Sequence, residues 1–515
     1  MPSKVFSAAI MGLDAKLVEV EVDVSHGLRS FSIVGLPDKA VQESKERIEA
    51  AIKSSKLLSP HHRTFRILVN LAPADLKKEG SLYDLPIALA FLIASKQTNF
   101  NPEDKIFLGE LSLDGKLRPI KGALSFALMA KKEGLKEIIL PKQNAKEAAL
   151  VKNLKVIGVE SLTEILAYLE NRKTIEPLLL KDLPTNLSEN SINVVDISWI
   201  KGQEYAKRAL EISAAGGHNL FFFGPPGGGK SLLAKSLPSI LPQLTFDESL
   251  EVTKIYSVAG LLLENQNLIN ARPFRSPHHT LSEVALIGGG NPPRPGEMTL
   301  AHRGILFLDE FPEFHRDALE SLRQPIEDGK ITVSRAKNTF TFPSRFTLIA
   351  ASNPCPCGYL NSPEKPCSCS PSQISMYKRK LSGPLMDRID IFIEVPAVKY
   401  EKLASESSGN QSHILREKIT KTRNIQKERF KNDSSINSGQ AILTNAEMNI
   451  PEIKKYCQHD GRSQNLLKKY VDSGKLSARG YHRVLKVAKT IADLTESENI
   501  KYEHIAESLM YRLKD

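Results

Sequence analysis

The stretch FFFGPPGGGKS, from Phe221 to Ser231, constrains this chain more than any other part of it. An apolar run breaks into glycines and ends in Lys230 and Ser231, which fits the phosphate-binding pattern Gly-x-x-x-x-Gly-Lys-Ser. That pattern needs a strand before it and a helix after it, and NLFFF and SLLAKSL supply them. The alternative is a glycine-rich turn that only opens a helix. The order of strand, loop, Lys-Ser and helix favours a nucleoside triphosphate site.

The chemistry of phosphates predicts the contacts of this loop. Glycines let backbone N–H groups approach phosphate oxygens, and the following helix adds its positive N-terminal end. Lys230 is expected at the β- and γ-phosphates, and the Ser231 hydroxyl is expected to ligate Mg²⁺. The nucleotide-binding residues expected here are Gly224, Pro225, Pro226, Gly227, Gly228, Gly229, Lys230 and Ser231.

Two further apolar segments, both predicted strands, have polar residues at their carboxyl ends. GILFLDE ends in Asp309 and Glu310, an acidic pair that can hold Mg²⁺ and polarise an attacking water. FTLIAASNP ends in Asn353, whose amide could orient that water. Each stretch alone could be a strand with a polar cap, but their order after the phosphate-binding loop favours ATP hydrolysis.

Composition divides the 515 residues into blocks. Residues 1–170 alternate strand-like and helical runs, and 171–193 form a polar, proline-containing linker. Short strands alternate with amphipathic helices over 194–398, which is typical of a parallel sheet, and 399–515 is helical and charged. The net charge of +11 favours a polyanionic partner. Neither a signal peptide nor a membrane span is expected, so the prediction is a cytoplasmic protein.

Several motifs together resemble a known family. The series LFLDE, ASNP, GPLMDRIDI and LSARGYHRVLKVAKTIADL resembles AAA+ ATPases of the magnesium-chelatase/MCM branch. PFRSPHHTLSEVALIGGG, RPGEMTLAHRGILFLDEFPEF and NPCPCGY are similar to signatures of the YifB/ComM family. The resemblance spans essentially the whole chain. It implies an α/β protein with a Lon-protease-like α+β domain, an AAA+ P-loop core and a C-terminal helical lid.

The resemblance also implies a ring, a homo-hexamer with ATP between subunits. Arg388 matches the position of an arginine finger that reaches a neighbour's γ-phosphate, and Arg479 matches the lid's sensor arginine, with Arg483 as the second choice. A guanidinium suits both roles because it binds phosphate oxygens bidentately. Without the family resemblance, Arg388 would be expected to form a surface ion pair with Asp387 or Asp390.

The N-terminal block is similar to the Lon protease domain, in KKEGSLYDLPIALAFL and LGELSLDGKLRPIKGALSFALMAKKEG. A Lon-type mechanism needs a serine activated by a lysine. The match puts Leu82 at the serine and Leu124 at the lysine, and leucine can do neither task. Ser81 and Lys121 lie nearby, so a shifted dyad stays open. The prediction is a scaffold without peptidase activity.

Four of the five cysteines lie close together in the stretch CPCGYLNSPEKPCSC. Cys355, Cys357, Cys367 and Cys369 form two C-x-C pairs, and four thiolates can close a tetrahedral zinc site. The alternative is a loop with reduced thiols. The prediction is a structural Zn²⁺ that braces the loop following Asn353.

Two basic segments are candidates for contact with DNA. GKITVSRAKNTFTFPSRF alternates like a hairpin, with Arg335 and Lys337 near its turn. The loop GGGNPPRPGEMTLAHR carries Arg294. The resemblance places both segments at the channel of the ring, where basic side chains would bind the phosphate backbone without reading sequence. On charge alone, Arg335 and Lys337 are expected to be solvated residues of the turn.

The leading functional hypothesis is an ATP-driven DNA motor. The resemblance implies helicase and branch-migration activity on single-stranded and branched DNA, in homologous recombination during natural transformation. The alternative is a chelatase- or MoxR-like ATPase that remodels a protein partner. A third class, an ATP-dependent protease, is disfavoured by Leu82 and Leu124.

Overall fold

The computed structural model describes residues 2–60, 64–180, 195–263, 266–290, 293–334, 339–361, 365–381, 383–397, 411–431 and 442–512. The chain divides into two compact units. The first takes in Met1–Ser188, Phe246–Asn270 and Asn291–Arg294, and the second takes in Glu189–Thr245, Ala271–Gly290 and Pro295–Asp515. Among the helices of the described residues, none combines the length and apolar character that a bilayer crossing requires.

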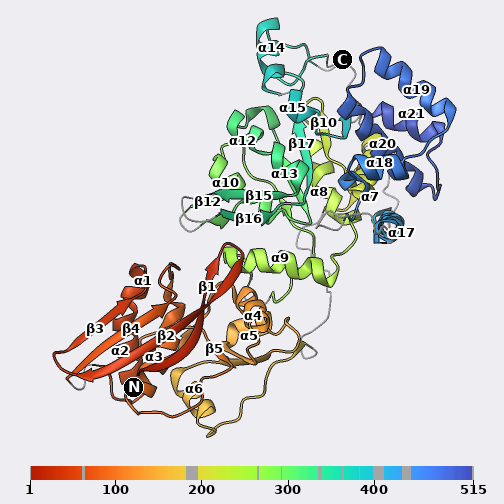
Figure 1. Cartoon of the computed structure of the whole chain (residues 1–515). Coiled ribbons are helices and arrows are strands. Elements are labelled where there is room, and N and C mark those ends of the chain that lie inside the picture. Colours follow the sequence, from red (N-terminus) through yellow and green to blue (C-terminus); the bar gives the residue numbers. More distant parts are fainter. Residues whose placement is uncertain are drawn as a thin grey trace. The chain divides into compact units, whose positions relative to one another are not determined.

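The first unit is built on a seven-stranded mixed sheet in the order β3-β4-β2-β1-β5-β8-β9 (Figure 1). The β1–β2 and β2–β4 pairs are antiparallel, whereas the remaining neighbours are parallel. The strands span Ser3–Met11 (β1), Asp14–His26 (β2), Ser30–Val34 (β3), Phe65–Ala72 (β4), Lys105–Phe107 (β5), Glu137–Pro141 (β8) and Lys155–Val159 (β9). A short β6–β7 pair joins Glu110–Leu111 to Leu117–Arg118.

Helices of the first unit follow local sequence signals. The Asp38 side chain caps α1 by accepting a hydrogen bond from the Val41 amide at 2.8 Å. The apolar helix α3 is buried along nearly its whole length, as a helix without a polar face must be. The helices span Lys39–Gln42 (α1), Ser44–Ser54 (α2), Asp84–Ala94 (α3), Ala123–Lys132 (α4), Lys142–Ala148 (α5) and Leu162–Leu169 (α6).

Helix α9, Phe246–Ala259, also belongs to the first unit, although its sequence lies inside the predicted ATPase block. It lies beside α4 (Figure 1), and Leu250 packs against the core that α4 shares. The Ser257 hydroxyl donates to the buried Glu147 carboxylate, and Lys254 pairs with Asp14 at 2.5 Å. The chain thus leaves the second unit after Thr245 and returns to it at Ala271.

The second unit contains a five-stranded, wholly parallel sheet in the order β11-β14-β17-β10-β18. Its strands span Leu220–Phe223 (β10), Phe274–Arg275 (β11), Ile305–Leu308 (β14), Thr347–Ser352 (β17) and Ile391–Glu394 (β18). The four longer strands, β10, β14, β17 and β18, are apolar runs that are almost completely buried, as expected for a sheet covered on both faces. This sheet brings the ends of β10, β14 and β17 together.

Helices surround this sheet and form the C-terminal part of the unit (Figure 1). Around the sheet lie Glu204–Gly216 (α7), Lys230–Ile240 (α8), Glu283–Ile287 (α10), Glu297–Leu300 (α11), Arg316–Ser321 (α12), Arg323–Asp328 (α13), Pro371–Lys380 (α14) and Gly383–Met386 (α15). The C-terminal helices are Gln411–Lys431 (α17), Ile450–Tyr456 (α18), Gly461–Asp472 (α19), Ala478–Leu494 (α20) and Tyr502–Met510 (α21). The predicted fold class, a parallel α/β core with a helical C-terminal region, is confirmed.

Candidate functional site

The phosphate-binding loop connects β10 to α8, and its glycines are required by its shape. A Cβ on Gly224 would come within 2.1 Å of the Val395 carbonyl oxygen, so only glycine lets the loop pass the end of β18. Gly227 and Gly229 have φ values of +78° and +85°, which side chains disfavour. The space beside both Cα positions is open. The loop therefore presents backbone groups to a bound anion.

Lys230 begins α8 and points back into this loop. Its Nζ donates to the carbonyls of Gly224 at 2.7 Å and Pro225 at 2.8 Å, and to Oδ1 of Asn353 at 3.1 Å. Burial lowers the pKa of Lys230, while the charge of Asp309 opposes that shift. A buried ammonium held by neutral oxygens would gain a stronger partner in a phosphate.

The Ser231 hydroxyl donates to Oδ2 of Asp309 at 2.5 Å. Asp309 follows β14 directly, and its other oxygen, Oδ1, accepts from the Glu310 amide at 2.9 Å. Glu310 has a φ of +50°, a left-handed conformation that few non-glycine residues adopt. The serine and aspartate oxygens fit a site for Mg²⁺, a cation that prefers oxygen ligands.

The parallel register explains why these residues meet. Phe223 of β10 pairs with Ser352 of β17, and Leu308 of β14 pairs with Ala350 of the same strand. The phosphate-binding loop, the acidic pair and Asn353 therefore start from one edge of the sheet, at the carboxyl ends where ligands bind in such folds. The structure brings Lys230 into contact with Asn353 across this edge.

The two arginines expected at phosphates lie in different surroundings. Arg388 is only 8% exposed, and it pairs with Glu327 at 2.9 Å while donating to the Pro384 carbonyl at 2.6 Å. Its Nε is buried and has no hydrogen-bond partner among the described residues. Arg479 is exposed in the first turn of α20. Arg483, the second choice for the same role, is engaged in an ion pair with Asp390 at 2.5 Å.

Two further residues at the site were not predicted. His279 lies with Nδ1 3.0 Å from Oε2 of Glu310. Gln203 donates from Nε2 to the Pro396 carbonyl at 2.7 Å and to the Gly228 carbonyl at 3.3 Å, so it braces the phosphate-binding loop. The adjacent histidines of SPHHT are a weak signal for the first residue. No sequence pattern indicates the second, because its contacts depend on how distant segments meet.

The four predicted cysteines form one cluster. The sulfur of Cys355 lies 3.4 Å from that of Cys357 and 3.7 Å from that of Cys367, and all four ligand atoms, Cys369 included, lie within 4.8 Å of one another. Thiolates held 2.3 Å from a tetrahedral zinc would be separated by about 3.8 Å. Hydrogen bonds from backbone amides lower the pKa of the Cys357 thiol to about 5. At Cys367 a backbone hydrogen bond is outweighed by burial and by the neighbouring cysteine sulfurs, which raise the pKa of that thiol to about 12. The thiolate that metals bind is therefore favoured first at Cys357. The cluster fits Zn²⁺.

The loop that carries the four cysteines contacts the phosphate-binding loop, and the helix that follows it, α14, contacts Asn353. A Cβ on Gly358 would lie 2.6 Å from Cγ of Pro226, so this loop packs closely on the phosphate-binding loop. Tyr377 of α14 is buried, which raises its pKa to about 12, while a hydrogen bond with the Asn353 backbone opposes that rise. The cysteine loop, through Gly358, and α14, through Tyr377, therefore both lie against Asn353 and support its position.

The segments expected to contact DNA are only partly described. Strands β15 (Lys330–Ser334) and β16 (Thr339–Pro343) pair antiparallel, so the predicted hairpin forms. Arg335 and Lys337 lie outside the described residues. Arg294 is exposed at the start of the two-residue strand β13, Arg294–Pro295.

The Lon-like positions lack a serine–lysine pair. Leu124 is completely buried, and Leu82 packs against the same cluster of apolar side chains. The Ser81 hydroxyl donates to Glu110, and the Lys121 side chain lies against Gly260. Neither contact is the hydrogen bond between nucleophile and base that peptide hydrolysis requires.

Comparison with known proteins extends these observations to the whole chain. Models described as "Magnesium chelatase, subunit ChlI", "Subunit ChlI of Mg-chelatase" and "Magnesium chelatase, subunit ChlI C-terminal" match residues 196–403, 20–144 and 409–512. The competence protein ComM of Haemophilus influenzae is 42% identical, with 99% of this chain and 97% of ComM covered. The uncharacterized protein YifB of Escherichia coli is 40% identical, with 100% and 97% covered. The DNA replication licensing factor Mcm2 of Drosophila melanogaster is 26% identical over 210 residues, 38% of this chain and 20% of Mcm2.

Proposed function

This chain belongs to the YifB/ComM family of magnesium-chelatase-related AAA+ ATPases, and from that premise we propose that it is an ATP-driven ring motor acting on DNA. One observation carries the hydrolytic part of the proposal. Lys230, from the phosphate-binding loop, contacts Asn353 at the end of β17, while the next residue, Ser231, contacts Asp309 at the end of β14. Three strand ends thus meet around one anion-binding loop.

The residues of this site divide the chemistry among them. Ser231 and Asp309 would hold Mg²⁺, which when bound neutralises charge on the β- and γ-phosphate oxygens. Lys230 would exchange the loop carbonyls for phosphate oxygens, and the freed Asn353 amide would orient the attacking water. Glu310 is the proposed group that polarises this water, since its half-exposed carboxylate lies next to Asp309 in the chain.

In the proposed ring, arginines would supply the positive charge at the ATP phosphates that Lys230 and Mg²⁺ do not provide. In a homo-hexamer, Arg388 would exchange Glu327 for the γ-phosphate of the neighbouring subunit. This exchange requires its buried side chain to turn outward, and the Nε, which has no partner among the described residues, would gain one there. Arg479 would reach the phosphates from the lid. The zinc proposed at the four cysteines has a structural role and holds the loop that follows Asn353.

The proposal that DNA is the cargo rests on charge and on relatives. The chain carries a net charge of +11. Two relatives are named as a competence protein and as a DNA replication licensing factor. Arg335 and Lys337 of the hairpin, with the exposed Arg294, are the proposed contacts to the backbone of single-stranded and branched DNA. The proposed process is helicase and branch-migration activity in homologous recombination during natural transformation.

The family models support a second candidate. Their descriptions concern a magnesium chelatase subunit, which favours an ATPase that remodels a protein partner. Displacement of a labelled strand from forked DNA, with ATP, distinguishes the two. The motor proposal predicts displacement that Lys230→Ala abolishes. Efficient ATP hydrolysis without movement of forked or four-way DNA would favour protein remodelling.

A further inference from the structure

Helix α19 and the turn that follows it form an exposed surface that is almost entirely cationic. Residues 461–475 contain four basic residues but one acid, Asp472. The basic residues are all exposed, and together we call them the α19 surface: Arg462, Lys468, Lys469 and Lys475. None of them forms an ion pair with a residue that the structure describes. Their charge is therefore available to an anionic partner.

The α19 surface differs from other exposed cations of the chain, which often meet carboxylates, as Lys136 meets Asp104 at 2.6 Å. The acid at the start of α19 has a different task. Asp460 caps this helix by accepting a hydrogen bond from the Ser463 amide at 2.8 Å. Hydrogen bonds from Ser463 lower the pKa of Asp460 more than the charge of Arg462 does. This acid therefore serves the backbone of α19 rather than an ion pair with the α19 surface.

Helical spacing puts the exposed polar side chains of α19 in rows. Arg462, Asn465 and Lys469 follow one another at intervals of three and four residues, so they form one row. Gln464 and Lys468, four residues apart, form the neighbouring row. From Arg462 to Lys469 the helix rises about 10 Å, the axial length of about three nucleotides in one strand of duplex DNA. Cationic and amide side chains are the groups that contact DNA phosphates.

The form of DNA that fits this surface follows from what α19 lacks. All residues of α19 are described, and its exposed face carries no aromatic side chain. Tyr456 and Tyr470 are half-buried and pack against the apolar cluster of the lid. Sites for single strands stack bases on aromatic rings, whereas a row of cations fits the regularly spaced phosphates of a duplex. The surface therefore favours duplex DNA.

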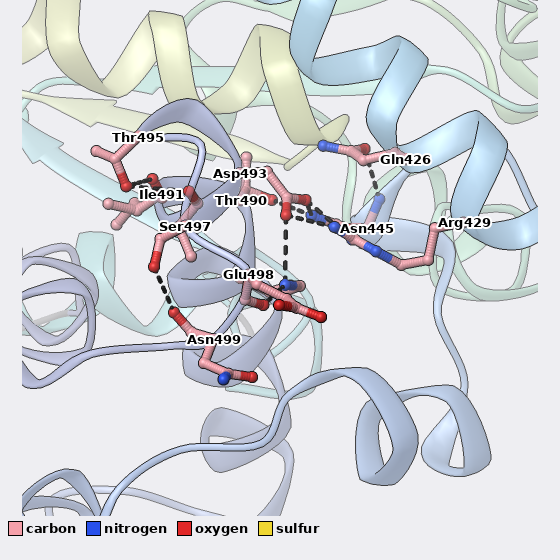
Figure 2. Close-up of polar contacts among 12 residues, drawn as sticks. Gln426, Arg429, Asn445, Thr490, Ile491, Asp493, Thr495, Ser497, Glu498 and Asn499 are labelled. Carbon is pink, nitrogen blue, oxygen red and sulfur yellow. Dashed lines mark hydrogen bonds and ion pairs between the residues drawn. The ribbon is translucent and has the colours of Figure 1, made fainter.

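The α19 surface stands on a firmly packed base. Leu467, on the inner face of α19, is 2% exposed and belongs to the apolar cluster shared with α20 and α21. Helix α20 is in turn joined to α17, because Arg429 pairs with Asp493 at 2.5 Å and Asn445 donates to the same carboxylate at 2.8 Å. Figure 2 shows the Arg429 and Asn445 side chains directed toward Asp493. The cations are thus presented by fixed helices.

The α19 surface is separate from the nucleotide site of its own chain. Arg483 of α20 pairs with Asp390, the residue before β18, and Asp390 accepts from the amide of Asn219, the residue before β10. These strands are parallel, so their starts lie at the edge of the sheet opposite to the phosphate-binding loop. The α19 surface ends at Lys475, just before α20, and therefore adjoins this opposite edge.

We propose that the α19 surface is a second DNA contact, which binds the phosphate backbone of a duplex without reading its sequence. The inference rests on the proposed function, in which DNA is the cargo. On a forked substrate, the α19 surface holds a duplex arm, while the hairpin of β15 and β16 contacts a single strand. Electrostatic binding of this kind weakens as salt rises.

Fluorescence anisotropy tests the proposal with a labelled duplex and a labelled single strand of equal length, without ATP and over a series of salt concentrations. Arg462→Ala/Lys468→Ala/Lys469→Ala removes three phosphate contacts. Its duplex affinity should fall at least about tenfold at low salt, and the slope of log affinity against log salt should become shallower by about two to three. Its single-strand affinity should stay within about twofold of wild type. Its Tm should match that of wild type, because the three side chains are exposed.

Lys421→Ala/Lys427→Ala/Lys431→Ala is the matched control, because it removes the same charge from exposed positions of α17. It should keep the duplex affinity of wild type. Equal weakening by the two triple alanine variants would show an effect of net charge alone and overturn the proposal.

Arg462→Lys/Lys468→Arg/Lys469→Arg keeps all three charges and should bind the duplex within about twofold of wild type. Wild-type duplex affinity and salt slope in the alanine variant of α19 would overturn the proposal and leave the proposed function standing. Equal losses for duplex and single strand would overturn the assignment to a duplex. A wild-type protein that binds neither DNA at low salt would reject the proposed function itself, and this inference with it.

Discussion

The imidazole of His279 lies 3.0 Å from the carboxylate of Glu310, measured from Nδ1 to Oε2. Glu310 is the residue proposed to polarise the attacking water, and a carboxylate oxygen that contacts an imidazole is not free to contact that water. A half-exposed polar contact of this kind contributes up to about 1 kcal/mol, which corresponds to about fivefold in an equilibrium. We therefore predict that His279→Ala raises the DNA-independent ATPase rate by up to about fivefold. Steady-state phosphate release measures this rate.

His278→Ala is the matched control, because His278 hydrogen-bonds Thr280 at 3.0 Å rather than Glu310. It should leave the rate at the wild-type value. A loss of activity in His279→Ala would instead show that the histidine holds Glu310 in its productive position.

Glu310→Gln should separate binding from hydrolysis. The amide keeps the size of the side chain but cannot accept a proton, so turnover should fall by about 10²- to 10⁴-fold. ATP affinity, measured by equilibrium binding, should stay close to that of wild type. Glu313→Gln removes a nearby carboxylate that pairs with Lys380 at 3.2 Å, and it should retain turnover. Equal losses in the two variants would exclude a specific role for Glu310.

The cysteine cluster predicts about one zinc per chain after purification without added metal. Cys367→Ala should lose this zinc and lower the ATPase rate, because the cysteine loop packs on Pro226 and supports Asn353. Elemental analysis and phosphate release on the same samples measure both effects. Cys457→Ala, which removes a buried cysteine of the lid, should keep the metal. A metal-free wild-type protein with full activity would contradict the prediction.

Burial lowers the pKa of Lys486 to about 8 from an ordinary value of 10.5. Between these values the unfolded chain binds more protons than the folded one, so the free energy of unfolding should rise with pH. Between about pH 7.5 and pH 9.5 the gain from this group is about 2 kcal/mol. Urea unfolding at the two pH values should show a smaller rise in Lys486→Met than in wild type. Lys475→Met, the same change at an exposed lysine, should show the same rise in the free energy of unfolding as wild type. An equal rise in wild type and both variants would contradict the lowered pKa of Lys486.

Local patterns in the sequence predict much of the nucleotide site. The phosphate-binding loop, the acidic pair and Asn353 each end a short apolar strand, and parallel pairing necessarily brings such ends to one edge. The hairpin of β15 and β16 follows from alternation in the same way. The family resemblance, which spans the whole chain, is confirmed by the relatives. The roles assigned to Arg388 and Arg479 stay predictions.

Other features depend on contacts between distant segments, which local patterns do not encode. Helix α9 has an ordinary helical sequence, and nothing in it indicates that Ser257 bonds to Glu147 of the N-terminal unit. The ion pair of Arg483 with Asp390 joins residues 93 positions apart. The helical segment after Asp38 is divided at Glu43 into α1 and α2, a boundary that depends on packing as well as on local sequence.

The most direct test of the motor proposal is the ATPase rate with and without single-stranded DNA at low salt, where phosphate contacts are strongest. The account predicts severalfold stimulation that Lys230→Ala abolishes and that Arg335→Ala/Lys337→Ala weakens. An active ATPase whose rate is unchanged by DNA at low salt would contradict it.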